Sequence, residues 1–484
     1  MKKTALVLTI LIALCACFNL YGCKKQNDSR TTYNINCTLN KNVLSGMETV
    51  GFYNDTENSF TELKFNLFGN AYRKDAKYSP IAPEYTSRAY PNGINYGDMR
   101  INSVKCSGKD LEFSVGGEDQ NILTVKLIEE VFPEERVNVS IDFTLNLANV
   151  IARTGVNVKT INLANFYPIL CAIDDGSFYE CLYYAIGDPF YSDCADYTVT
   201  LTADKDYVVA ASGKKSSEKV SADTATRTYK ISNARSFAFT LSKNFQVITD
   251  TSTGVEINYY YYDDGEPEKS IGYAVNALKT FTNLFGTYPY STYSVVKTPF
   301  VQGGMEFPAL TMIADDLDGM PYGEVIVHET AHQWWQTAVG NNEIEYGFLD
   351  EGLAEYSVVL FYEKFPEYGY TRESLIKASE DTYKVFCTVS DKVFGKVNTV
   401  MIRSLKDFGG EYEYVNIAYV KPCIMYDTLR KTVGDARFFT ALRRYYSSYK
   451  FKNATPHDLV GAFEKTGADT NGFFQSFFDG KVII

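Results

Sequence analysis

The sequence predicts a multidomain α+β protein in which an all-β, sandwich-like N-terminal domain precedes a mostly helical domain. At 484 residues the chain is long enough for two or three domains with sizeable cores. From residue 31 to about residue 262, polar and apolar residues alternate in short runs, which is typical of half-buried strands. From residue 263 to residue 484, apolar residues recur at helical spacing instead.

The N-terminal domain is expected to contain strands joined by short turns. Residues 61–68 alternate for a full strand, and residues 32–39 and 137–147 show the same period. Turn residues recur between such runs, as at 107–110. The segment 187–193, Gly-Asp-Pro-Phe-Tyr-Ser-Asp, is interpreted as a further turn with a structural role.

The pattern of the second domain begins near Pro267, which suits the first turn of a helix. Four apolar residues then follow at helical spacing: Ile271, Val275, Leu278 and Phe281. A strand is expected at residues 294–296, leading into a glycine-rich turn at 303–306. Further helices are expected from about residue 418 to the end of the chain.

The most informative stretch is His-Glu-Thr-Ala-His at residues 328–332, which holds two of the chain's three histidines. On a helix starting near Pro321 and stopping near residue 340, His328 and His332 lie on one face, one turn apart. Both imidazoles can therefore bind one metal ion, while Glu329 handles the proton of an attacking water molecule. This arrangement predicts a hydrolase with one Zn²⁺ ion.

A catalytic zinc site takes a third protein ligand, and Glu351 is the strongest candidate. Eighteen residues separate it from His332, which leaves room for a turn and a second helix. Glu355 lies one helical turn further along. Two interpretations of Glu355 stay open: it supports a ligating histidine, or it is a solvated carboxylate.

This spacing of two histidines and a glutamate resembles the gluzincin aminopeptidases, the membrane alanyl aminopeptidase family. Their second motif, Gly-x-Met-Glu-Asn, is similar to residues 303–307, with Phe307 in place of Asn. The resemblance implies that Glu306 binds the free α-amino group of a peptide, as an ammonium pairs with a fixed carboxylate. The substrate-binding residues it implies are Gly303, Gly304, Met305 and Glu306.

The resemblance also implies a thermolysin-like catalytic domain in which a tyrosine stabilises the transition state. The best match is Tyr419, followed by Lys421 and then by Pro422 where the family has glycine. Long family members add a large helical domain over the active site. Because this sequence stops at residue 484, a more open cleft is expected.

The first residues predict export. Residues 1–22 combine two lysines with a short apolar core, as a signal peptide does, and residues 23–30 form a polar tether. Cys23 lies in a sequence that resembles a bacterial lipoprotein cleavage box, with Cys17 as a competing site. The chain is therefore expected on the outer face of the cytoplasmic membrane, held there only by a lipid, or otherwise secreted.

Net charge and cysteine count restrict the classes of binding partner and the disulfide pattern that the chain can have. The formal charge is −12 without a visible basic patch, which disfavours nucleic-acid binding. Seven cysteines follow Cys23, an odd number that excludes complete pairing, and most are expected to be buried thiols.

The expected function is zinc-dependent hydrolysis of the N-terminal peptide bond of peptides that have a free amino terminus. Two alternatives stay open. One is a zinc endopeptidase or an epoxide-type hydrolase of the same superfamily. The other is a catalytically weak surface lipoprotein that keeps the fold for binding, which the departures at Phe307 and Pro422 would favour.

Overall fold

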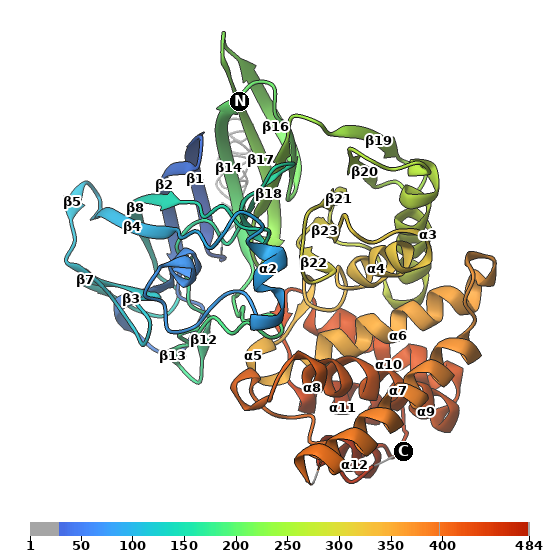
Figure 1. The fold of residues 1–484 in the computed structure, drawn as a ribbon. Coiled ribbons are helices and arrows are strands. Elements are labelled where there is room, and N and C mark those ends of the chain that lie inside the picture. Colours follow the sequence, from blue (N-terminus) through green and yellow to red (C-terminus); the bar gives the residue numbers. More distant parts are fainter. Residues whose placement is uncertain (1–28, 396, 483–484) are drawn as a thin grey trace, which may run out of the picture.

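The structure, a computed structural model, describes residues 29–482 apart from Lys396. The expected signal segment, most of the tether and the cleavage site at Cys23 lie outside the described residues. A β-rich N-terminal part lies beside a second part, in which a small sheet is followed by helices (Figure 1). The predicted order of an all-β domain and a mostly helical domain is confirmed.

The N-terminal part is built on three main sheets and a short hairpin. The largest sheet has the order β16-β17-β14-β1-β2-β8-β4-β5. Its strands are β1 (Thr32–Asn40), β2 (Val43–Tyr53), β4 (Asp98–Cys106), β5 (Lys109–Asp110), β8 (Arg136–Asn146), β14 (Ala195–Asp204), β16 (Lys214–Val220) and β17 (Thr224–Ala234). All neighbours pair antiparallel except β1 and β14, which run parallel.

Two four-stranded sheets, with the orders β15-β18-β10-β9 and β11-β3-β7-β6, complete this part. Their strands are β3 (Phe60–Asn66), β6 (Phe113–Gly116), β7 (Ile122–Val131), β9 (Thr154–Val156), β10 (Ile161–Ala164), β11 (Ile169–Leu170), β15 (Val208–Ala211) and β18 (Ala238–Ser242). The remaining elements are the hairpin β12 (Ile173–Asp174) and β13 (Ser177–Phe178), the 3₁₀ turns Phe68–Tyr72 and Pro83–Tyr85, and the short helix α2 (Thr86–Ala89).

The core of the large sheet follows the alternation read from the sequence. In β1, Ile35, Cys37 and Leu39 are buried while the residues between them are exposed. The same alternation in β2 buries Glu48, whose two carboxylate oxygens are without a hydrogen-bond partner among the described residues. Burial raises the pKa of Glu48 well above its usual value, so this carboxyl stays protonated in the core.

Glu48→Leu is expected to raise the free energy of unfolding by about 1–3 kcal/mol, because it removes a buried, unsatisfied polar group. The gain should be larger at pH 8 than at pH 5. The unfolded chain releases this proton above pH ~4.3 while the folded chain keeps it, so wild-type stability falls as the pH rises. Thermal unfolding midpoints at both pH values measure this. Glu48→Gln is the control that removes only the titration, and a lower midpoint for Glu48→Leu at both pH values would contradict the prediction.

The second part opens with a five-stranded sheet of order β19-β20-β21-β23-β22. Its strands are β19 (Gln246–Asp250), β20 (Glu256–Tyr261), β21 (Thr292–Thr298), β22 (Gly304–Phe307) and β23 (Leu310–Ala314). The first two strands precede residue 263, so this sheet starts within the range assigned to the N-terminal domain. The expected glycine-rich turn is the edge strand β22, which pairs antiparallel with β23 alone.

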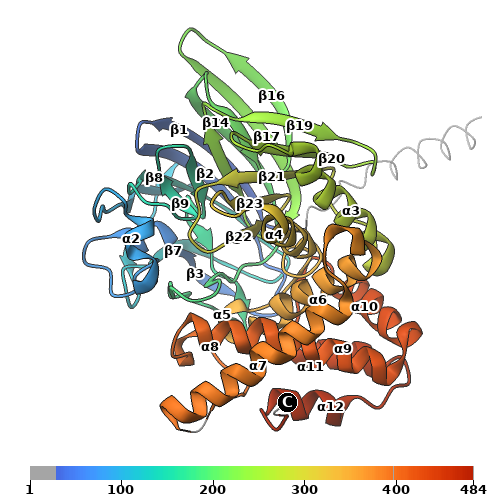
Figure 2. The same cartoon turned by 45° about the vertical axis from the view of Figure 1, so that its right-hand side comes forward.

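Helices make up most of the remaining chain, and Figure 2 shows α7 running along the outside of the helical group. They are α3 (Pro267–Phe285), α4 (Gly319–Ala331), α5 (Glu343–Tyr346), α6 (Phe348–Lys364), α7 (Arg372–Phe394), α8 (Glu411–Val415), α9 (Lys421–Val433), α10 (Asp435–Tyr449), α11 (Pro456–Glu464) and α12 (Asn471–Phe478). The 3₁₀ turns are Pro366–Tyr368 and Leu405–Asp407, a π-helical turn spans Asn416–Val420, and β24 (Val339–Gly340) pairs with β25 (Lys452–Asn453).

The helix that carries the two histidines is shorter than expected. It begins at Gly319, two residues before Pro321, and ends at Ala331, so His332 is its C-cap rather than an interior residue. The stop expected near residue 340 is wrong, because residues 332–338 already fold into turns and β24 follows at Val339. The one-turn relation survives, since the backbone amide of His332 donates to the carbonyl of His328 at 3.3 Å.

Two further expectations concern the thiols and the membrane. Among the described residues the seven cysteines are free, and five of them are buried: Cys37, Cys171, Cys181, Cys387 and Cys423. Among the helices of the described residues, none combines the length and the apolar character needed to span a bilayer.

Candidate active site

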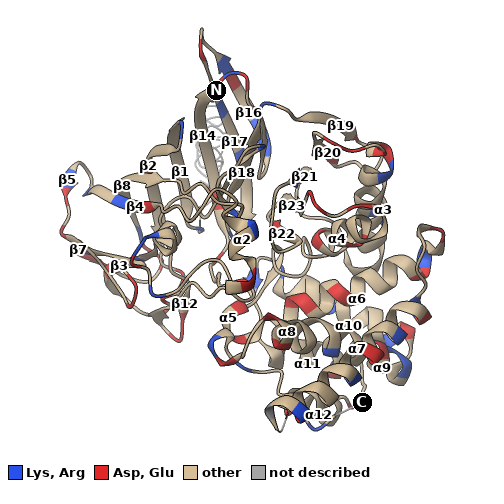
Figure 3. Ribbon diagram, in the orientation of Figure 1, with Lys and Arg blue, Asp and Glu red and all other residues tan. Residues whose placement is uncertain are grey.

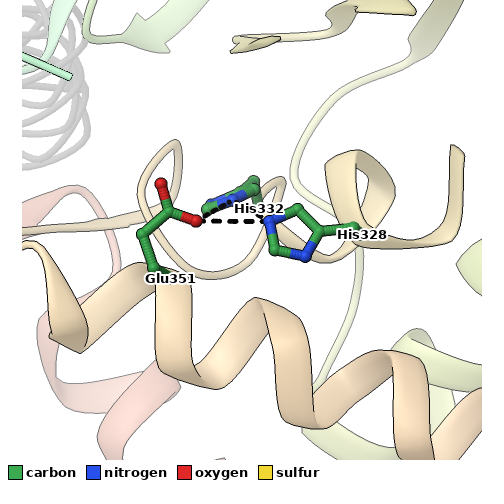
Figure 4. Close-up of side chains that lie close together, drawn as sticks. All are labelled: His328, His332 and Glu351. Atoms are coloured by element: carbon green, nitrogen blue, oxygen red, sulfur yellow. Dashed lines mark hydrogen bonds and ion pairs between the residues drawn. The ribbon is translucent and has the colours of Figure 1, made fainter. Parts of the chain in front are cut away.

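Three side chains from two helices converge on one point. His328 and His332 come from α4 and its C-cap, and Glu351 comes from the first turn of α6 (Figure 4). The two Nε2 atoms lie 3.0 Å apart, and Glu351 Oε2 lies 3.2 Å from each of them. The sequence prediction that these three residues form one cluster agrees with this geometry.

The donor set fits zinc. The other ring nitrogen of each histidine has its own partner: His328 Nδ1 lies 3.2 Å from Glu355 Oε2, and His332 Nδ1 lies 3.0 Å from the carbonyl of Trp335. With a proton on each Nδ1, both Nε2 lone pairs face the common point, as in histidines that bind metals. A tetrahedral zinc site needs ligand atoms about 3.3 Å apart, close to the distances found here.

Glu355 therefore contacts His328, which favours the first of its two interpretations, support of a histidine that binds the metal. Glu351 is 3 % exposed. Burial alone would raise its pKa, but the neighbouring His332 and His328 hold the pKa of this carboxyl well below its usual range. Glu351 is thus an anion ready to bind a cation.

Glu329 lies beside the cluster on the same helix. Burial raises its pKa to about 7, against the opposing effect of the two imidazoles. Its position depends on Gly304 of β22, because a Cβ atom there would lie 2.2 Å from Glu329 Oε1. Gly304 is therefore needed to make room for the carboxylate.

Glu306 reaches the same place from the edge strand β22. One ligand atom each of Glu306, Glu329 and His332 lie within 4.8 Å of one another. Glu306 is 3 % exposed, and its Oε1 is without a hydrogen-bond partner among the described residues. Burial raises the pKa of this carboxyl well above its usual value. A fixed acid with an unused acceptor beside the cluster is what an ammonium group requires.

The neighbours of Glu306 are divided between the cavity and the core. Gly303 and Gly304 line the cavity, and Gly303 has a φ of 90°, a conformation that glycine adopts without strain. The side chains of Met305 and Phe307 instead pack in a buried apolar cluster. Gln333 of the helix end donates to the carbonyl of Phe307 at 3.1 Å and so ties β22 to the histidine segment. The substrate-binding roles of these residues remain predictions.

Tyr419 faces the cluster from the π-helical turn that precedes α9, an irregular helix that is often found at functional sites. Its ring stacks on that of His328, with centroids 5.8 Å apart. Burial is the main cause that raises the pKa of Tyr419, and the negative charge of the nearby Glu351 adds to it. The hydroxyl therefore keeps its proton and can donate a hydrogen bond. Pro422 packs against Gly352 of α6, where a Cβ atom would lie 2.4 Å from the proline ring.

Asp188 is a site residue that the sequence interpretation missed. The segment assigned to a simple turn brings its carboxylate to the cavity, where Arg153 pairs with it at 2.6 Å. Arg153 is buried and Asp188 is largely shielded, and this ion pair is a tertiary contact that joins two distant segments. Only the charged residue inside the Gly187-Asp188-Pro189 turn offered a signal, and many turns carry such a residue.

These groups surround a cavity of about 210 Å³. Its lining residues are Asp188, Gln302, Gly303, Gly304, Glu306, Glu324, Val325, His328, Glu329, His332, Glu351, Glu355 and Tyr419. Lysine and arginine are missing from this lining, and acidic segments mark α4 and the adjoining part of α6 in Figure 3. The cavity is therefore a site for cationic groups.

Two imidazoles and a carboxylate around one cation position, with a glutamate beside them, define a zinc hydrolase site on a two-part scaffold. Residues 270–478 match the family described as "Peptidase family M1 domain". This match agrees with the resemblance of the sequence to the gluzincin aminopeptidases.

Similar proteins agree with this assignment. Leucine aminopeptidase 2 of Emericella nidulans is 26% identical over 211 residues, which are 41% of this chain and 33% of that protein. Human Aminopeptidase B is also 26% identical over 211 residues, 41% of this chain and 31% of its own length. A Leukotriene A-4 hydrolase homolog of Botryotinia fuckeliana is 26% identical over 192 residues, which are 38% of this chain and 28% of that protein. The matches span about a third of these relatives.

Solved structures match along nearly the whole chain. The M1 zinc metallopeptidase from Deinococcus radiodurans has a TM-score of 0.67 and 17% identity, covering 94% of each chain. A variant of that enzyme bound to the substrate Tyr-Ser-Ala has a TM-score of 0.66 and 17% identity, covering 94% of this chain and 95% of its own. The predicted fold class is thereby confirmed over 94% of the chain.

Proposed function

We propose that this protein is a zinc aminopeptidase that hydrolyses the first peptide bond of peptides with a free amino terminus. The observation that carries the proposal is the convergence of His328, His332 and Glu351, with Glu329 and Glu306 lining the same cavity. The match of residues 270–478 to the peptidase family M1 domain supports it.

The residues divide the work of hydrolysis. Zinc, when bound by the two imidazoles and Glu351, supplies a positive charge that acidifies water and polarises the scissile carbonyl. Glu329 accepts a proton from the attacking water and delivers it to the leaving amine. Tyr419 donates a hydrogen bond to the negative oxygen that develops on the substrate carbonyl.

Glu306 limits the reaction to chain ends. A peptide whose α-ammonium pairs with this buried carboxylate has its first peptide bond beside the histidine cluster. The edge strand β22 offers unpaired backbone groups next to it, to which an extended peptide can bind as an added strand.

The test combines metal content with a matched pair of substrates. The purified protein is expected to contain about one zinc per chain and to cleave free-amino tripeptides, and a chelator should abolish cleavage. N-acetylation of the same peptides should stop the reaction, because it removes the ammonium that Glu306 binds.

Cleavage of acetylated and free peptides at equal rates would instead identify an endopeptidase. A zinc-loaded protein that leaves both peptides intact would favour the epoxide-type hydrolase or the binding lipoprotein.

We further propose that the chain is exported and anchored through Cys23. The support is the sequence of residues 1–30, with its two lysines, short apolar core and polar tether. Metabolic labelling with palmitate tests it, since Cys23→Ser should lose a label that the wild type carries, and an unlabelled wild type would contradict it.

A further inference from the structure

One carboxylate of the cavity has no task in the proposed reaction. Six acids line the cavity: Asp188, Glu306, Glu324, Glu329, Glu351 and Glu355. Glu351 contacts both imidazoles, Glu355 contacts His328, and Asp188 pairs with Arg153. Glu329 and Glu306 have the roles given above. Glu324 is left over, and the ion pairs between described residues do not include it.

Glu324 lies on α4 one turn before His328, so the two side chains share a face of the helix. Glu324 is half-buried. Burial is the main cause that raises its pKa to about 7, and repulsion from Glu355 adds to it. His328 and a hydrogen bond from the Tyr370 hydroxyl act in the opposite direction and favour its charged form. A carboxylate in this environment is stabilised by a cation that enters the cavity.

The position of Glu324 along α4 separates it from Glu306. Glu324 lies one turn before His328, whereas His332, one turn after His328, forms a close group with Glu306 and Glu329. When the ammonium group of a peptide is bound at Glu306, its first peptide bond lies beside the histidine cluster. Its second residue, which follows the scissile bond, then lies toward Glu324.

The adjoining lining suits a long basic side chain. Val325 lies next to Glu324 and is also partly exposed to the cavity. An apolar contact followed by a carboxylate matches lysine and arginine, which bury their methylene stems and present a charge at the end. Because lysine and arginine are absent from the lining, neither of them occupies Glu324 within the cavity.

We propose that Glu324 selects peptides with lysine or arginine as their second residue, immediately after the bond that is cut. This selectivity rests on the proposed aminopeptidase function and names the substrate class of the same site. Glu324 contacts the leaving part of the substrate and takes no part in proton transfer.

The test compares tripeptides that differ in one position. The wild type should cleave Ala-Lys-Ala with a higher kcat/KM than Ala-Leu-Ala and Ala-Glu-Ala. In Glu324→Gln the ratio of kcat/KM for Ala-Lys-Ala to that for Ala-Leu-Ala should fall roughly 10- to 100-fold, the range for a lost charged hydrogen bond. Glu324→Asp should keep part of the ratio. Glu373→Gln, the same change at an exposed site of α7, should leave it at the wild-type value.

A binding measurement gives a readout that is independent of turnover. Calorimetric titration of Ala-Lys-Ala into Glu329→Gln protein should show binding that weakens about tenfold when Glu324→Gln is added. Thermal midpoints identify any variant that has lost its fold.

The outcomes separate the two proposals. An unchanged ratio in Glu324→Gln, or an effect confined to Lys-Ala-Ala, whose lysine precedes the bond, overturns the role of Glu324 while the aminopeptidase stands. If no peptide is cleaved, the aminopeptidase proposal fails, and the calorimetric comparison still decides whether Glu324 binds the basic side chain.

Discussion

Glu329→Gln is expected to lower kcat by about 10²–10⁴-fold while the protein keeps its zinc, the range for removal of a general base. Glutamine preserves the shape of the side chain beside Gly304, where any added atom would collide, but it cannot accept a proton. The proposed metal ligands are His328, His332 and Glu351, so the proposal predicts that metal content does not change. Steady-state kinetics on a free-amino tripeptide and zinc analysis of the same sample measure both effects.

The control for this variant is Glu373→Gln, which makes the same chemical change on the exposed surface of α7. It should retain wild-type kcat and zinc. Normal turnover in Glu329→Gln would refute the assignment of the base. Loss of zinc together with turnover would show that Glu329 supports the metal site rather than the proton transfer.

Tyr419→Phe is expected to lower kcat by about 10²–10³-fold with little change in KM, the effect of removing one donor to a developing negative charge. The ring can keep its stacking on His328, so the variant removes the hydroxyl and little else. The raised pKa of Tyr419 means that the hydroxyl is protonated throughout the working range and acts as a donor. Kinetics with the same tripeptide separate kcat from KM.

Tyr412→Phe is the matched control, because Tyr412 lies nearby on α8 and is 54% exposed. It should behave as wild type. A loss confined to KM in Tyr419→Phe would indicate that Tyr419 binds the ground state of the substrate, and the assigned role would be wrong.

The sequence predicted most where the chemistry is local. His328 and His332 are related by one helical turn, and that relation holds even though α4 ends a residue before His332. Glu351 could be reached because the connection after His332 is short and returns on α6. Glu306 could also be reached, because its motif stands only 22 residues before His328 and its strand β22 contacts α4.

Residues brought in by distant packing escaped prediction. Asp188 belongs to the N-terminal part, and its approach to the cavity depends on pairing with Arg153, which lies 35 positions away. Glu324 stands in a helix whose pattern gives no sign that one acid faces a cavity. The end of α4 was predicted near residue 340 for a related reason. A turn residue marks where a helix is able to stop, and packing decides where it does stop.

The free edge of β22 has a consequence for how broadly the protein can act. An added strand is held through its amide and carbonyl groups, which every residue except proline presents alike. Affinity along that edge would then be nearly blind to composition, and discrimination would rest on a few side-chain contacts at the ends of the bound segment. Proline has no backbone N–H, so a peptide with proline where β22 requires a donor would bind poorly. Stepwise removal of residues would then stop at that proline.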